Sequence, residues 1–129
     1  MIDHLSTSAI DFDATQKFYD AVFATLGYER NVDMVTSWDP ENPTRRICAY
    51  GPGQKPTFWV GEAGEANGSR HVAFVAADRA AVDAFHAAGL EAGGKDNGAP
   101  GERPQYHPGY YGAFLIDPDG NNVEAVCHG

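Results

Sequence analysis

The chain has 129 residues, a formal net charge of −9 and a pI near 4.7. This acidic balance argues against binding to nucleic acid or to anionic membrane surfaces, because both attract basic patches. The sequence has no apolar run of about 18 residues, and its first residues resemble neither a secretory nor a membrane-targeting segment. We therefore expect a cytoplasmic protein of one domain that handles a small molecule.

The first half of the chain predicts one strand, one helix and three further strands. Loose alternation of apolar and polar residues over 2–10 predicts the first strand. Acidic residues at 11–13 supply oxygens for the N-cap of a helix, which Gly27 ends. Three short strands are then expected at residues 32–37, 46–50 and 57–60.

The second half repeats this order in part. A strand is predicted at 71–76, followed by a helix from about residue 79 to 88 and a short extended piece at 90–92. Residues 95–111 are rich in Gly, Pro and Tyr, and they predict a long aromatic loop. A closing hairpin is expected from strands at 113–116 and 122–126 around a type I turn at 117–120.

An internal repeat relates the two halves at an offset of 67 residues. When the segment that begins at His4 is aligned with the segment that begins at His71, seven of 24 positions are identical. Such self-similarity defines the architecture before any local pattern does. We predict an α+β fold of two tandem βαβββ modules, with the boundaries 1–62 for the first module, 63–69 for a linker and 70–129 for the second module.

Two strand histidines and one strand carboxylate are candidate metal ligands. His4 and His71 are equivalent by the repeat, and Glu124 lies in the last predicted strand. Aligning the closing hairpins at an offset of 66 pairs Phe58 with Glu124. The fourth ligand position of a symmetric metal site would therefore hold an aromatic side chain instead of a ligand. Such a set suits Fe, Mn, Ni or Zn with open positions for substrate oxygens. Alternatively, the histidines are hydrogen-bonded wall residues and the carboxylate faces solvent.

Further candidates surround this set. Histidine is the side chain best suited to acid–base chemistry near neutral pH, and His107 lies in the predicted loop, so it is a candidate acid or base. Tyr111 is a candidate proton donor. Arginine can hold a substrate carboxylate, and aromatic side chains can form an apolar wall. The predicted substrate-binding residues are Phe58, Trp59, Arg103, Tyr106 and Tyr110.

Four segments of the sequence resemble the vicinal oxygen chelate superfamily, which contains the glyoxalases, bleomycin resistance proteins and extradiol dioxygenases. They read MIDHLS, FYDAVFATLGY, RHVAFVA and HPGYYGAFLIDPDGNNVEAV, and together they cover nearly the whole chain. The resemblance implies a homodimer whose mixed sheets curl into a cup around a divalent metal ion. The family's metal ligands match His4, His71 and Glu124.

One position departs from the glyoxalase pattern. Glyoxalases usually carry a fourth ligand on the last strand of the first module, where this chain has Phe58 or, with a one-residue shift, Trp59. The remaining set resembles that of extradiol dioxygenases, with His107 and Tyr111 at second-sphere positions. Two functions therefore stay open: a metal-dependent lyase, isomerase or dioxygenase acting on neighbouring oxygens, or an antibiotic-type binding protein without turnover.

Overall fold

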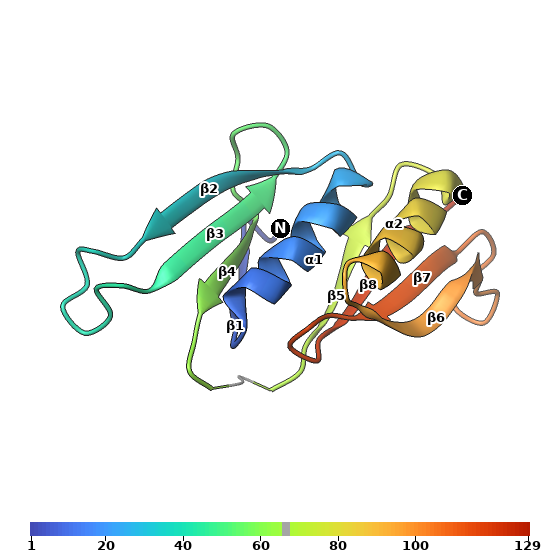
Figure 1. The fold of residues 1–129 in the computed structure, drawn as a ribbon. Helices are drawn as coiled ribbons and strands as arrows, with labels where there is room; N and C mark the ends of the chain where they lie inside the picture. The colour runs from blue at the N-terminus through green and yellow to red at the C-terminus, as the bar shows by residue number, and fades with distance from the viewer. Residues whose placement is uncertain (66–67) are drawn as a thin grey trace.

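Two modules lie side by side in the computed structural model, which describes residues 1–65 and 68–129 (Figure 1). Each module packs one helix against one four-stranded mixed sheet, which confirms the predicted pair of βαβββ modules. The two sheets are not closed into barrels, and among the described residues no strand of one sheet pairs with a strand of the other. In the same part of the chain, no helix is long and apolar enough to cross a membrane.

The first module places β1 next to β4, in the sheet order β1-β4-β3-β2, with β1 and β4 parallel. Its helix begins where predicted, because the side chain of Asp11 accepts a hydrogen bond from the main-chain N–H of Ala14 at 3.0 Å. The first strand is shorter than predicted, so His4 precedes it. The elements are β1 (Leu5–Ala9), α1 (Phe12–Ala24), β2 (Glu29–Val35), β3 (Arg46–Gly51) and β4 (Phe58–Glu62).

The second module repeats this arrangement in the sheet order β5-β8-β7-β6, with β5 and β8 parallel. Asp78 caps its helix as Asp11 caps the first, with 2.8 Å between its carboxylate and the N–H of Ala81. The elements are β5 (His71–Val75), α2 (Arg79–Glu91), β6 (Lys95–Glu102), β7 (Tyr111–Ile116) and β8 (Asn122–Cys127).

Two predictions in the second module are wrong. The extended piece expected at 90–92 is the end of α2, and residues 95–102 form strand β6 instead of the first half of a loop. This strand lacks apolar alternation because Gly98 and Gly101 interrupt it, and its pairing with β7 shifts register beside both glycines. The loop itself is limited to residues 103–110.

The hydrophobic core is shared between the modules. The ring of Phe23 on α1 lies 4.8 Å from that of Phe74 on β5, and the ring of Phe58 on β4 lies 5.5 Å from Phe74. The two helices also contact each other directly (Figure 1). Edge-to-face aromatic contacts of this kind stabilise packing beyond the buried area alone.

The turn between β7 and β8 fixes one module against the other. Asp117 is 4% exposed, and one of its carboxylate oxygens accepts hydrogen bonds from the Tyr19 hydroxyl at 2.5 Å and the Asn121 side-chain amide at 2.9 Å. Its other oxygen accepts the main-chain N–H groups of Asp119 and Asn121, each at 2.9 Å. Burial, followed by the negative charge of Asp117, raises the pKa of Tyr19 well above its ordinary value.

Candidate functional site

Each sheet has one face covered by its helix and one face that the helix leaves free, which we call the open face. On β8, Val123 and Ala125 point into the core, so Glu124 points to the open face by strand alternation. Glu124 is nevertheless only 2% exposed. A carboxylate that is so deeply buried requires partners that compensate its charge.

His71 is the first partner of Glu124. Its Nε2 lies 3.1 Å from Oε1 of Glu124, and its Nδ1 lies 3.2 Å from the main-chain carbonyl of Asn122. Since a carbonyl can only accept, Nδ1 carries the proton of that hydrogen bond. In the neutral tautomer, Nε2 then directs a lone pair at a carboxylate oxygen. A cation, either a proton or a metal ion, is needed between these two atoms.

Tyr110 is the second partner. Its hydroxyl donates a short hydrogen bond to Oε2 of Glu124, so the two carboxylate oxygens have different partners. Gly112, which the sequence interpretation missed, leaves room for this contact: a Cβ atom there would lie 3.2 Å from Oε2 of Glu124 and 3.2 Å from the Tyr110 ring. The predicted strand began at residue 113, so Gly112 fell just outside it, although β7 includes it. A glycine inside a strand often marks a close approach, and this signal was therefore not recognised.

We expect Tyr110 to ionise near pH 12, because desolvation and then the hydrogen bond to Glu124 raise its pKa to about 12. The folded state therefore favours the protonated phenol. The resulting stabilisation is complete below the ordinary pKa of about 10 and is lost as the pH rises through the higher value. Ultraviolet titration of the protein, minus that of Tyr110→Phe, measures this pKa. An unchanged value in Glu124→Gln would contradict the contact.

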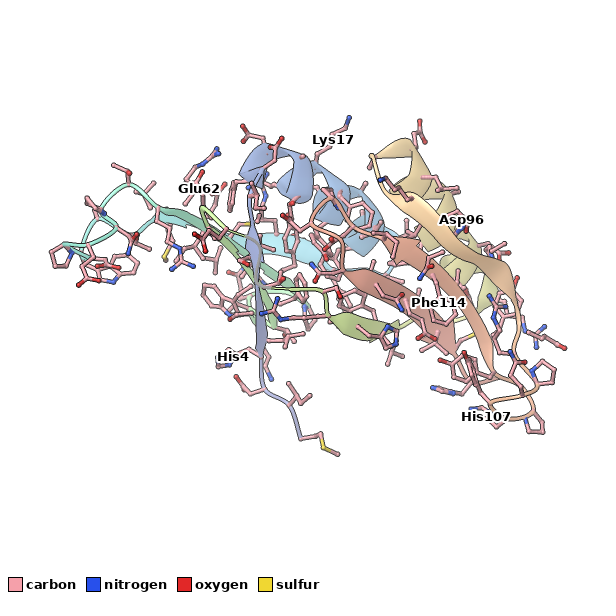
Figure 2. All side chains as sticks on the ribbon, turned by 90° about the horizontal axis from the view of Figure 1, so that it is seen from below. His4, Lys17, Glu62, Asp96, His107 and Phe114 are labelled. Atoms are coloured by element: carbon pink, nitrogen blue, oxygen red, sulfur yellow. The ribbon has the colours of Figure 1, made fainter. Side chains whose placement is uncertain are left out.

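His4 occupies the corresponding place in the first module but lies apart from this pair. It is exposed, it precedes β1, and its Nδ1 lies 2.7 Å from Oδ1 of Asp3. Figure 2 shows His4 at the end of the first strand, whereas Phe114 and His107 lie in the other half of the molecule. No cluster of three or more His, Cys, Asp or Glu side chains that could hold a metal ion occurs within residues 1–65 and 68–129.

Strand pairing identifies the first-module counterpart of Glu124. Ser6 pairs with Trp59 across β1 and β4, and Ala73 pairs with Glu124 across β5 and β8. Because the repeat offset relates Ser6 to Ala73, Trp59 corresponds to Glu124. The sequence predicts Trp59 at this position if the alignment shifts by one residue. Phe58 is 4% exposed and packs in the core, so it does not reach the open face.

Glu62, the nearest carboxylate in the first module, is engaged elsewhere. Its Oε1 accepts the main-chain N–H of Arg46 at 3.2 Å, and its Oε2 lies 3.2 Å from a guanidinium nitrogen of the same arginine. The first module therefore contributes the imidazole of His4, whose neighbouring carboxylate is that of Asp3, while Glu62 stays bound to Arg46. The glyoxalase-like fourth ligand is missing for a structural reason as well as by sequence.

Neither of the two predicted proton-transfer residues forms a hydrogen bond with His71 or Glu124. The Tyr111 hydroxyl donates to Asp83 on α2 at 2.6 Å, because Tyr111 faces the helix side of β7. The Nε2 atom of His107 lies 2.9 Å from Nδ1 of His128, and the His107 ring packs edge-on against Tyr110 with 5.2 Å between centroids. Tyr110, and not Tyr111, contacts Glu124.

The remaining predicted substrate-binding residues border the open face of the second sheet. Tyr106 is 57% exposed, and its ring packs edge-on against Tyr110 with 5.0 Å between centroids. The guanidinium carbon of Arg103 lies 5.5 Å from the centre of the Phe114 ring. Phe114 in turn lies 6.2 Å from the His71 ring, measured between centroids. An aromatic surface thus connects Arg103 to the His71–Glu124 pair.

Comparison with known proteins finds the same fold repeatedly. No family model and no curated protein sequence matches the chain. Among solved structures, a glyoxalase/bleomycin resistance protein from Albidiferax ferrireducens is 31% identical, with a TM-score of 0.71 and 96% of each chain covered. A glyoxalase/bleomycin resistance protein/dioxygenase family enzyme from Burkholderia phytofirmans is 22% identical over 97% of this chain and 96% of that one, with a TM-score of 0.64.

A longer relative shows the same fold at lower identity. Glyoxalase I from Zea mays is 21% identical with a TM-score of 0.67, and the match covers 98% of this chain but 45% of the maize chain. The match to the Albidiferax protein assigns the family, because it covers 96% of each chain at 31% identity. The chain belongs to the glyoxalase/bleomycin resistance protein family, within the vicinal oxygen chelate superfamily.

Proposed function

We propose that the protein is a divalent-metal-dependent enzyme that acts on a small molecule with two neighbouring oxygens. The observation that carries this proposal is the pair formed by His71 and Glu124, whose Nε2 and Oε1 atoms face each other at 3.1 Å. Their other polar atoms are engaged by Asn122 and Tyr110. A metal ion between the two ligand atoms would satisfy both.

The donor set fits a metal site. Metal-ligating histidines commonly donate their second ring N–H to a backbone carbonyl, as His71 does to Asn122. Imidazole with carboxylate suits Fe, Mn, Ni or Zn. A divalent ion in this position would supply Lewis acidity and open positions for two substrate oxygens. Tyr110, whose pKa is raised to about 12, keeps its proton at neutral pH and acts as a hydrogen-bond donor beside the site.

We place the third ligand, His4, on a second copy of the chain. One chain presents His4 on the first module and the His71–Glu124 pair on the second, without bringing them together. The open faces also leave apolar side chains in solvent, since Met34 is 39% and Val75 is 67% exposed. A homodimer in which the first module of one copy covers the second module of the other would bury these side chains and complete the ligand set.

Metal analysis tests the proposal. We expect protein purified without chelator, or reconstituted with Fe, Mn, Ni or Zn, to bind one divalent ion per chain at saturation. His4→Ala and Glu124→Gln are expected to lose that ion while circular dichroism shows an unchanged fold. Glu62→Gln is the matched control, because Glu62 is paired with Arg46 and should retain full metal content. Wild-type protein that stays free of metal after reconstitution would refute the proposal.

A further inference from the structure

A row of positions crosses the open face of the second sheet. Ala73 pairs with Glu124, Glu124 pairs with Phe114, and Phe114 pairs with Gly98, so one residue of each strand lies in the row from β5 to β6. The last position has no side chain. A Cβ atom at Gly98 would lie 3.0 Å from the Phe114 ring and 3.3 Å from a terminal nitrogen of Arg103. The guanidinium of Arg103 therefore covers the end of the row.

Main-chain carbonyls hold this guanidinium. One terminal nitrogen of Arg103 donates to the carbonyl of Ala99 at 2.8 Å, and the other donates to the carbonyl of Glu102 at 3.4 Å. Gly101 adds room on the same side, since a Cβ atom there would lie 3.1 Å from a terminal nitrogen. A guanidinium has five N–H donors, so these two contacts leave donors for a ligand.

Arg103 carries a positive charge at the border of the open face. Within the described parts of the chain, no carboxylate forms an ion pair with it. Its neighbour Glu102 turns away and pairs with Arg79 on α2 at 2.9 Å. In a chain of net charge −9, an arginine without an acidic partner beside a candidate metal site is available to an external anion.

We infer that Arg103 is the subsite for an anionic group, such as a carboxylate, on the same substrate whose neighbouring oxygens face the His71–Glu124 pair. This inference rests on the proposed function. The substrate would lie across the Phe114 ring, whose centre is 6.2 Å from the His71 ring and 5.5 Å from the Arg103 guanidinium carbon. The substrate class is thus a small compound with a planar or apolar middle, two adjacent oxygens at one end and an anion at the other.

Calorimetry under anaerobic conditions, on the full chain loaded with Mn²⁺, tests the inference with three probes. Catechol carries two neighbouring oxygens, 3,4-dihydroxyphenylacetate adds a carboxylate, and phenylacetate has the carboxylate alone. Wild-type protein is expected to bind 3,4-dihydroxyphenylacetate about ten- to hundredfold more tightly than catechol, as one charge-assisted pair allows. Arg103→Gln should lose this preference and bind both compounds as wild type binds catechol.

Lys95→Gln is the matched control, because it removes one positive charge at the other end of β6 and should retain the preference. The inference is overturned if wild type shows no preference for the carboxylate, or if Arg103→Gln keeps it. A separate arm measures phenylacetate with metal-free protein, where Arg103→Gln should lose binding. If Mn²⁺ does not strengthen catechol binding while phenylacetate still depends on Arg103, the proposed function fails and the anion subsite stands.

Discussion

Equimolar refolding of His4→Ala and His71→Ala chains together is expected to restore metal binding that neither variant shows alone. In a twofold dimer with shared sites, random pairing makes half of the dimers mixed, and each mixed dimer has one intact site. About a quarter of all sites should therefore bind metal. The physical reason is that His4 lies on one module and the His71–Glu124 pair on the other, without contact in one chain. Elemental analysis after dialysis measures the recovery.

A second mixture supplies the control. His71→Ala and Glu124→Ala remove ligands from the same half of the proposed site, so their mixed dimers contain no intact site. We expect no recovered metal from that pair. If the His4→Ala and His71→Ala mixture also recovers none, while wild type refolded in the same way binds metal, the shared site would be excluded.

Asp117→Ala is expected to lower the free energy of unfolding by about 3–5 kcal/mol, as measured by urea denaturation. The carboxylate accepts four hydrogen bonds, including those from the Tyr19 hydroxyl and the Asn121 amide, and it is 4% exposed. Its removal leaves buried donors without partners, and each such donor is costly. Because Tyr19 belongs to the other module, the loss falls on the packing between modules.

Asp33→Ala tests whether burial is the cause. This substitution also removes a carboxylate, but the Asp33 side chain is 62% exposed and pairs with Arg30 on the surface. We expect a change of about 0.5 kcal/mol or less. Equal effects from the two substitutions would show that the hydrogen-bonded turn contributes no more than a surface ion pair.

The architecture could be predicted from the sequence because several independent signals agree. The repeat relates His4 to His71, and both helices begin after an aspartate that caps them, Asp11 and Asp78. The apolar residues of each helix recur at helical spacing, so they form one face of the helix. Strand β6 was missed because its glycines remove the alternation on which strand prediction depends.

The candidate site was predictable as a set of residues and less so as a geometry. Glu124 and His71 lie next to each other. The pairing of Glu124 with Phe114 places Tyr110, and not Tyr111, on the same face of the sheet as Glu124. The choice between Phe58 and Trp59 depends on the strand register, which the sequence does not define. A shift of one residue would move each side chain to the other face of the sheet. The location of His4 depends on how the modules pack, which is a tertiary property.

The second module contacts the start of the first helix directly. Asp119 accepts the main-chain N–H of Ile10 at 2.9 Å and the Thr15 hydroxyl at 2.5 Å, so the second module helps to cap the start of the first helix. Together with the shared aromatic core, these bonds hold the two halves against each other. The covalent connection then acts through effective concentration, keeping each half near its complement during folding.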